Sequence, residues 1–185
     1  MKIGLFGGSF NPIHNGHIEI IESLLEKKLV DEVWALPCRK HAFNKELRKE
    51  EDRVSMIKLA IQNIPNTRLC DVELKSKEKS YSYLTLRKLE ETYSHHFYWI
   101  IGSDILDEIK RWYGYDNLKK EAEFIVFQRE NHAVKNPGIK IAYTLDGISS
   151  ISSTKIRNLA KEGKSLKNLI PLPIQDYITK KGLYK

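Results

Sequence analysis

The sequence predicts an α/β protein built on a parallel sheet, and its first forty residues carry the prediction. Residues 2–6 are a short apolar run bounded by glycines, which is typical of a buried strand. From Ile18 onward apolar residues recur at helical spacing, so an amphipathic helix begins near Gly16. A second apolar run, 32–36, stops at Pro37. Strand, helix and strand in this order form a crossover unit with two parallel strands.

Strands and helices continue to alternate after this unit. We expect helices over 52–63, 82–93 and 118–121, from Asp104, from about residue 152, and in the tail 171–185. Further strands are expected over 68–72, 97–101, 123–127 and 139–143. We find no internal repeat or linker, so the expectation is a single domain over 1–185 whose C-terminal helical part spans about 152–185.

Composition excludes several classes of protein. With 185 residues, 41% hydrophobic and 30% charged, the chain fits a globular protein, and no apolar run is long enough for a membrane span. Met1 leads directly into the first strand, so we expect no signal peptide and a cytoplasmic location with Cys38 and Cys70 reduced. The net charge of +7 fits nucleic acid or small phosphorylated substrates. Because the lysines are scattered, we expect no nucleic-acid partner.

The loop between the first strand and helix is the strongest functional signal. Glycines and other turn residues precede a helix start, where backbone N–H groups and the helix dipole favour an anion. His14 and His17 stand at this point. The spacing matches neither a dinucleotide-binding loop nor a P-loop. The histidines could be ordinary polar residues or zinc ligands, but no further donor stands at zinc spacing, and phosphate binding is favoured.

Three later segments offer further candidates. Asp104 follows a buried strand, where a carboxylate could hold a ribose hydroxyl or a metal ion, or cap a helix. The basic run 38–49 could neutralise a polyphosphate through Arg39, Lys40, His41 and Lys45, or be a solvated loop.

The aromatic segment 111–115 could be a packed lid or a platform for a planar ring. At 151–157 the sequence ISSTKIR places hydroxyls, Lys155 and Arg157 on a first helical turn. This turn could be a cap or an anion site.

Five motifs together resemble one enzyme family across essentially the whole chain. They are GGSFNPIHNGH at 7–17, IIGSD at 100–104, RWYGYD at 111–116, ISSTKIR at 151–157 and the tail PLPIQDYITKKGLYK at 171–185. In this order they resemble the bacterial nicotinate-mononucleotide adenylyltransferases of the HxGH nucleotidyltransferase superfamily. The resemblance implies a doubly wound, Rossmann-like parallel sheet in a three-layer α/β/α arrangement. It also implies Mg²⁺-dependent transfer of AMP from ATP to nicotinate mononucleotide, forming deamido-NAD and pyrophosphate in NAD biosynthesis.

The resemblance also implies roles for individual residues. Catalysis would depend on His14, His17, Lys45 and Arg157. ATP would be bound by Gly7, Gly8, Ser9, Phe10, His14, His17, Gly102, Asp104, Ser153, Thr154 and Arg157. The mononucleotide would be bound by Ser9, Lys45, Ser82, Trp112 and Tyr113. Asp104 would help to place a Mg²⁺ ion that the ATP phosphates mostly hold.

Departures from the family pattern keep alternatives open. After the second strand the bacterial family usually has a proline-proline-histidine-lysine stretch, where this chain has 38–45, CRKHAFNK, closer to the eukaryotic nicotinamide-mononucleotide enzymes. Nicotinamide mononucleotide is therefore an alternative substrate. Phosphopantetheine as acceptor, CTP as donor, and a non-enzymatic nucleotide sensor or RNA-binding protein are others. Asn11 stands where the bacterial motif often has aspartate. The assembly state is open, and a homo-oligomer is one alternative.

Overall fold

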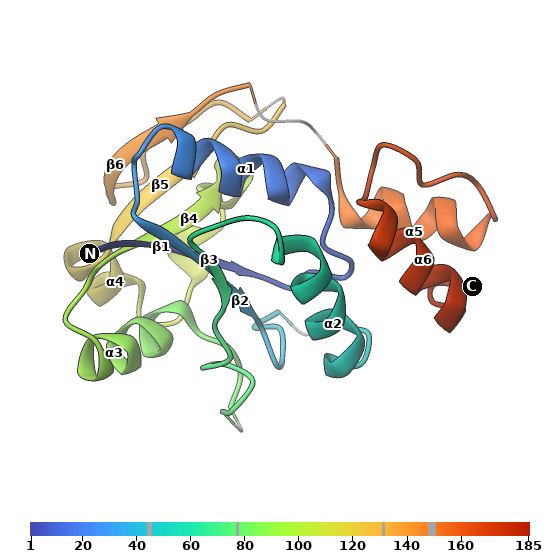
Figure 1. Ribbon diagram of the computed structural model, residues 1–185. Coiled ribbons are helices and arrows are strands. Elements are labelled where there is room, and N and C mark those ends of the chain that lie inside the picture. The colour runs from blue at the N-terminus through green and yellow to red at the C-terminus, as the bar shows by residue number, and fades with distance from the viewer. Residues whose placement is uncertain (44–45, 77, 131, 148–150) are drawn as a thin grey trace.

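One parallel sheet forms the centre of the computed structural model, which describes residues 1–43, 46–76, 78–130, 132–147 and 151–185 (Figure 1). Within these residues six strands pair in the order β3-β2-β1-β4-β5-β6, every pair parallel. The strands are β1 (Lys2–Gly8), β2 (Glu32–Pro37), β3 (Thr67–Leu69), β4 (His96–Gly102), β5 (Glu123–Phe127) and β6 (Lys140–Leu145). Strand order reverses between β1 and β4, and ligands bind at such a switch point.

Helices cover both faces of this sheet. Figure 1 shows α1 (Asn15–Glu26) on one face and α3 (Ser82–Thr92) with α4 (Tyr115–Glu121) on the other. On the α1 side lie α2 (Glu50–Ile61), α5 (Ser153–Lys161) and α6 (Leu172–Lys181), whose buried side chains join the same core. The doubly wound, three-layer prediction is confirmed.

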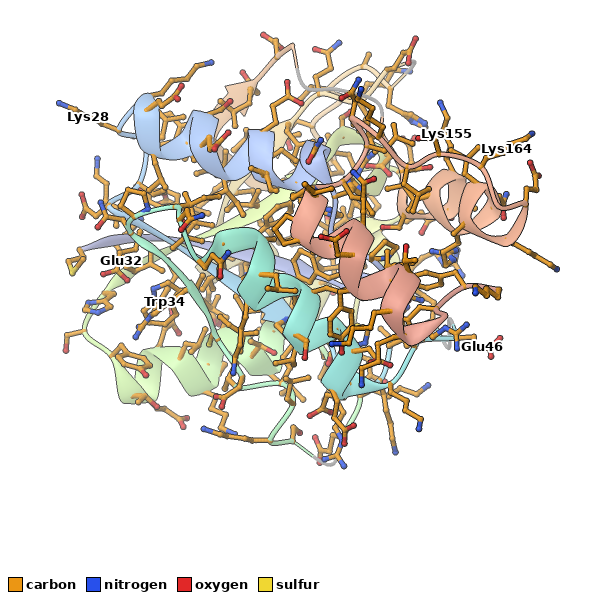
Figure 2. The ribbon with its side chains drawn as sticks, turned by 45° about the vertical axis from the view of Figure 1, so that its right-hand side comes forward. Lys28, Glu32, Trp34, Glu46, Lys155 and Lys164 are labelled. Carbon is orange, nitrogen blue, oxygen red and sulfur yellow. The ribbon has the colours of Figure 1, made fainter. Side chains whose placement is uncertain are left out.

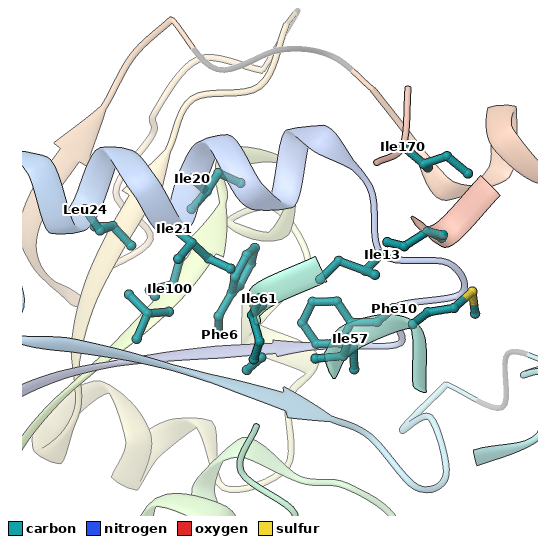
Figure 3. Packing of buried hydrophobic residues seen from close by; sticks show 14 of the residues in the cluster. Phe6, Phe10, Ile13, Ile20, Ile21, Leu24, Ile57, Ile61, Ile100 and Ile170 are labelled. Atoms are coloured by element: carbon teal, nitrogen blue, oxygen red, sulfur yellow. The ribbon is translucent and has the colours of Figure 1, made fainter. Parts of the chain in front are cut away.

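Strand side chains alternate between two cores because successive residues point to opposite faces. Phe6 of β1 and Ile100 of β4 face α1, where they meet Ile21 (Figure 3). Leu5 and Trp99 from the same strands enter the core under α3 and α4. Burial on both faces is what makes these strands continuous apolar runs in the sequence.

One local expectation was wrong. The helix expected from Asp104 is instead a pair of 3₁₀ turns, η1 (Ser103–Ile105) and η2 (Ile109–Arg111).

Candidate active site at the switch point

A cleft of about 1370 Å³ opens at the carboxyl ends of β1 and β4. Its wall combines the β1–α1 loop, the segment after β2, the start of α3, the 3₁₀ turns and α5. Every described residue to which the family resemblance assigns a role lines it: Gly7, Gly8, Ser9, Phe10, His14, His17, Ser82, Gly102, Asp104, Trp112, Tyr113, Ser153, Thr154 and Arg157. Lys45 lies outside the described residues.

The two histidines form a close pair of tilted rings at the start of α1. His14 is the N-cap residue and His17 lies three residues further, with ring centroids 3.7 Å apart. The backbone N–H of His14 donates to Nδ1 of His17 over 3.2 Å. A neutral His17 ring therefore carries its proton on Nε2 and can donate it to a ligand. His14 is 3% exposed, and its Nδ1 has no hydrogen-bond partner among the described residues.

Both rings are neutral at pH 7. Burial lowers the pKa of His14 from 6.5 to about 3, and the Arg129 cation adds to the effect. Burial, then His14 and Arg129, also hold the pKa of His17 well below its usual range. The pair therefore presents hydrogen-bond donors, while nearby arginines supply the positive charge.

The histidine loop is held from the C-terminal part of the chain. Tyr184 donates its hydroxyl to Oδ1 of the buried Asn11 over 2.9 Å. Arg157 donates to the carbonyl of Asn11 over 2.9 Å, and the Ser153 hydroxyl donates to the carbonyl of Pro12 over 2.8 Å. These bonds fix α5 against the loop, so the starts of α1 and α5 share one cleft.

The first turn of α5 combines capping with a polar face toward the cleft. The Ser152 hydroxyl accepts from the N–H of Lys155 over 3.2 Å, which caps the helix as its sequence suggested. Thr154 Oγ1 accepts from Arg157 over 3.1 Å, and Arg157 lines the cleft. Lys155 instead points outward into solvent (Figure 2). It therefore does not join Arg157 in the anion site that was one interpretation of this turn.

At the end of β4 a carboxylate meets an arginine from the neighbouring strand. Asp104 Oδ1 lies 3.3 Å from Nε of Arg129, which follows β5. Gly102 makes room for this pair, since a Cβ there would collide with Asp104 and lie 3.0 Å from Arg129 Nε. The sequence interpretation missed Arg129. Its position two residues after a buried strand, at the ligand-binding edge of the sheet, was the available signal.

Aromatic side chains form the far end of the cleft. The ring of Tyr113 stacks on Tyr81 with centroids 4.7 Å apart, and Trp112 packs beside them against the core under α3. Gly114, at φ 70°, lets the chain pass the Tyr83 ring, which a Cβ would meet at 2.7 Å. This end offers flat, partly apolar walls suited to a planar ring.

The segment after β2 contributes less charge than expected. Arg39 donates to the carbonyl of Ser76 over 2.7 Å, and neither Arg39 nor Lys40 lines the cleft. From the described part of this segment, His41, Phe43 and the cations Arg48 and Lys49 do line it. Of the two interpretations of this run, the solvated loop fits Arg39 and Lys40, because both are exposed and Arg39 is bound to the turn after β3.

A second missed arginine holds the loop from α2. Arg53 is 1% exposed and donates to the carbonyls of Ser9 over 2.9 Å, Cys38 over 2.8 Å and Arg48 over 3.2 Å. It stands four residues before the buried Ile57, on the inner helix face, and this spacing was the signal for its burial.

Comparison with known proteins gives the family. The model of the cytidylyltransferase-like proteins matches residues 5–159. Proteins described as probable nicotinate-nucleotide adenylyltransferases from Hydrogenobaculum sp. and Caldicellulosiruptor saccharolyticus are 37% and 36% identical, over 100% of this chain and 98% and 100% of theirs. The chain belongs to the nicotinate-nucleotide adenylyltransferase family. The structure of Plasmodium falciparum nicotinic acid mononucleotide adenylyltransferase complexed with NaAD superposes with a TM-score of 0.88 at 26% identity, covering 99% of this chain and 97% of that one.

Membership of the nicotinate-nucleotide adenylyltransferases confirms the enzyme class expected from the motifs. Family membership argues against the non-enzymatic alternative, because members of this family transfer a nucleotide. Within the described residues no helix has the length and apolar character needed to cross a membrane. Nor does the described chain contain a group of three or more His, Cys, Asp or Glu side chains arranged to hold a metal.

Proposed function

We propose that this cleft joins ATP to nicotinate mononucleotide at the histidine pair. The family reaction transfers the AMP moiety of ATP to the mononucleotide, giving deamido-NAD and pyrophosphate in NAD biosynthesis. An oxygen of the mononucleotide 5′-phosphate attacks the α-phosphorus of ATP, and the bond to the bridging oxygen breaks as pyrophosphate leaves. The observation that most supports this interpretation is a pair of buried, neutral imidazoles at a helix start, one of which carries its proton on Nε2 because its Nδ1 accepts the His14 N–H.

The reaction needs no protein nucleophile, so catalysis consists of positioning and charge stabilisation. His17 donates Nε2–H to a non-bridging oxygen of the α-phosphate, where negative charge grows in the transition state. His14 packs on the His17 ring and binds a neighbouring phosphate oxygen. Since both rings are neutral, their bonds to a phosphate lose no strength through deprotonation between pH 6 and 8, about the range over which an ordinary histidine titrates.

The leaving pyrophosphate is held from α5 and the glycine loop. Ser153, Thr154 and Arg157 bind the β- and γ-phosphates at the helix start, where backbone donors and the dipole favour anions. The loop residues Gly7, Gly8, Ser9 and Phe10 lie under the nucleotides. Arg129 adds a further positive charge beside the histidines, as its effect on their pKa supports.

The two nucleoside ends use opposite parts of the cleft. Gly102 and Asp104 contact the adenosine ribose, while the pyridine ring stacks on Trp112. Ser82 and the backbone near Tyr113 bind the pyridine carboxylate. Ser9 and Lys45 bind the mononucleotide phosphate; Lys45 enters the proposal from the family resemblance alone.

Mg²⁺ enters as the ATP complex. This ion is commonly bound by one or two carboxylates together with substrate phosphates, and it keeps several waters. The residues fit that mode, because Asp104 lines the cleft and its buried Oδ1, which lies 3.3 Å from Arg129 Nε, makes no hydrogen bond to the described residues. Asp104 would hold the ion, which neutralises phosphate charge when bound.

Pyrophosphate release tests the proposal. The protein is given ATP and Mg²⁺ with nicotinate mononucleotide or nicotinamide mononucleotide in parallel, and a tube without mononucleotide is the control. We expect release above the control with nicotinate mononucleotide, and the ratio of the two rates gives the preference. If folded protein releases no pyrophosphate above the control with either mononucleotide, the proposal is contradicted. Phosphopantetheine and CTP are then the next substrates to test.

A further inference from the structure

A buried carboxylate in the cleft wall has no part in the chemistry described above. Glu73 is 7% exposed and lines the cleft near its aromatic end. Thr85 donates its hydroxyl to Glu73 Oε1 over 2.8 Å, and the Ser80 hydroxyl also bonds to this carboxylate. Burial raises the pKa of Glu73, against the opposing effect of the two hydroxyls. A buried carboxylate is costly unless such hydrogen bonds compensate it.

The hydroxyl partners connect this carboxylate to three separate segments. Ser80 Oγ accepts the N–H of Arg39 over 3.1 Å, and the N–H of Ser80 donates to the carbonyl of Lys40 over 3.1 Å. Thr85 lies one turn into α3. Glu73 therefore joins the turn after β3, the segment after β2 and the start of α3.

Ser80 and Thr85 are the two anchors of Glu73, and the residues between them belong to the aromatic end of the cleft. Tyr81 and Ser82 stand between Ser80 and Thr85, and both line the cleft. The carbonyl of Tyr81 accepts the N–H of Thr85 over 3.0 Å, while its ring stacks on Tyr113. A shift of either anchor would move the walls on both sides of the proposed pyridine pocket.

We infer that Glu73 is a positioning residue for the mononucleotide site. Its carboxylate fixes Ser80 and Thr85, and these anchors set Tyr81 and Ser82 against the pyridine ring. The inference rests on the proposed function, which places the pyridine end here. The proposed ATP phosphate site is built from the starts of α1 and α5, which the hydrogen bonds of Glu73 do not involve, so Glu73 acts selectively on one substrate.

Steady-state kinetics of Glu73→Ala provide the test, with each substrate varied in turn. We expect the KM for nicotinate mononucleotide to rise about tenfold, as the loss of a buried hydrogen-bond anchor implies, with the KM for ATP and kcat within about twofold of wild type. Glu73→Gln keeps an acceptor for Thr85 and should restore the KM to within about threefold. Thr85→Val should raise the same KM, and Thr85→Ser should restore it.

Glu91→Ala, an exposed glutamate on α3, is the matched control and should leave both KM values unchanged. Three outcomes overturn the inference. The first is an unchanged KM for nicotinate mononucleotide in folded Glu73→Ala, and the second is an equal rise in the KM for both substrates. The third is a Glu73→Gln variant that fails to fold while Thr85→Val keeps the wild-type KM for nicotinate mononucleotide. Wild-type protein in the same assay separates the two claims. If the wild type turns over neither pyridine mononucleotide, the proposed function is wrong, and the inference about Glu73 is wrong as well because it rests on that function.

Discussion

Replacing Arg53 by methionine tests how the histidine loop is held. The guanidinium is buried and bonds three carbonyl groups, one in the loop after β1 and two in the segment after β2. Methionine keeps most of the aliphatic volume and removes the charge and all three bonds. The change therefore isolates the polar contribution of this side chain.

The expected loss follows from the number and kind of these bonds. A hydrogen bond that involves a charged group contributes about 1.5–3 kcal/mol, and a carbonyl left buried without a partner costs its desolvation. Removing the buried charge gives part of this back. We therefore expect Arg53→Met to lower the free energy of unfolding by about 3 kcal/mol, a large share of the roughly 5–15 kcal/mol typical of a domain.

Urea unfolding followed by circular dichroism measures this difference. Arg87→Met is the matched control, because Arg87 is half exposed and forms surface ion pairs with Glu90 and Glu121. Such surface pairs contribute less than about 1 kcal/mol. If the two variants lose the same stability, Arg53 does not hold the loop as argued.

Two further variants address the cleft itself. Because the folded pKa of His14 is about 3, below its ordinary 6.5, the unfolded chain takes up a proton first, and stability is lost as pH falls below 6.5. His14→Asn should thus lose about 1.4 kcal/mol less than wild type between pH 7.5 and 5.5, as measured by urea unfolding at both values; equal losses would contradict the pKa. Trp112→Ala should weaken binding of nicotinate mononucleotide with a smaller effect on kcat, because stacking exists in the ground state too. Unchanged affinity in a calorimetric titration would remove Trp112 from the site.

The fold could be predicted because its signals are local. Strands buried on both faces are continuous apolar runs, and the helices between them keep their apolar spacing. The exception lies after Asp104, where the same apolar spacing that predicts a helix belongs to two 3₁₀ turns. That segment is shaped by its contact with Arg129 and by the core below it, which no local pattern records.

The site could be predicted only where its residues are contiguous. The histidine loop and the start of α5 are single runs of sequence, and both line the cleft. Arg53, Arg129 and Glu73 were missed because their roles depend on partners brought close by folding. Arg53, for example, bonds a carbonyl 44 residues away. A polar residue on a buried helix face, or just beyond a buried strand, is the general signal for such positions.

The central claim is that His17 stabilises the transition state of adenylyl transfer. Single-turnover formation of deamido-NAD from saturating Mg-ATP and nicotinate mononucleotide measures this step directly. We expect His17→Ala to slow it by about 10³-fold with the fold intact, in the range found when one donor to a developing charge is removed. His96→Ala, an exposed histidine at the amino end of β4, should leave the rate unchanged. A folded His17→Ala within tenfold of wild type, roughly 1.4 kcal/mol, would contradict the account.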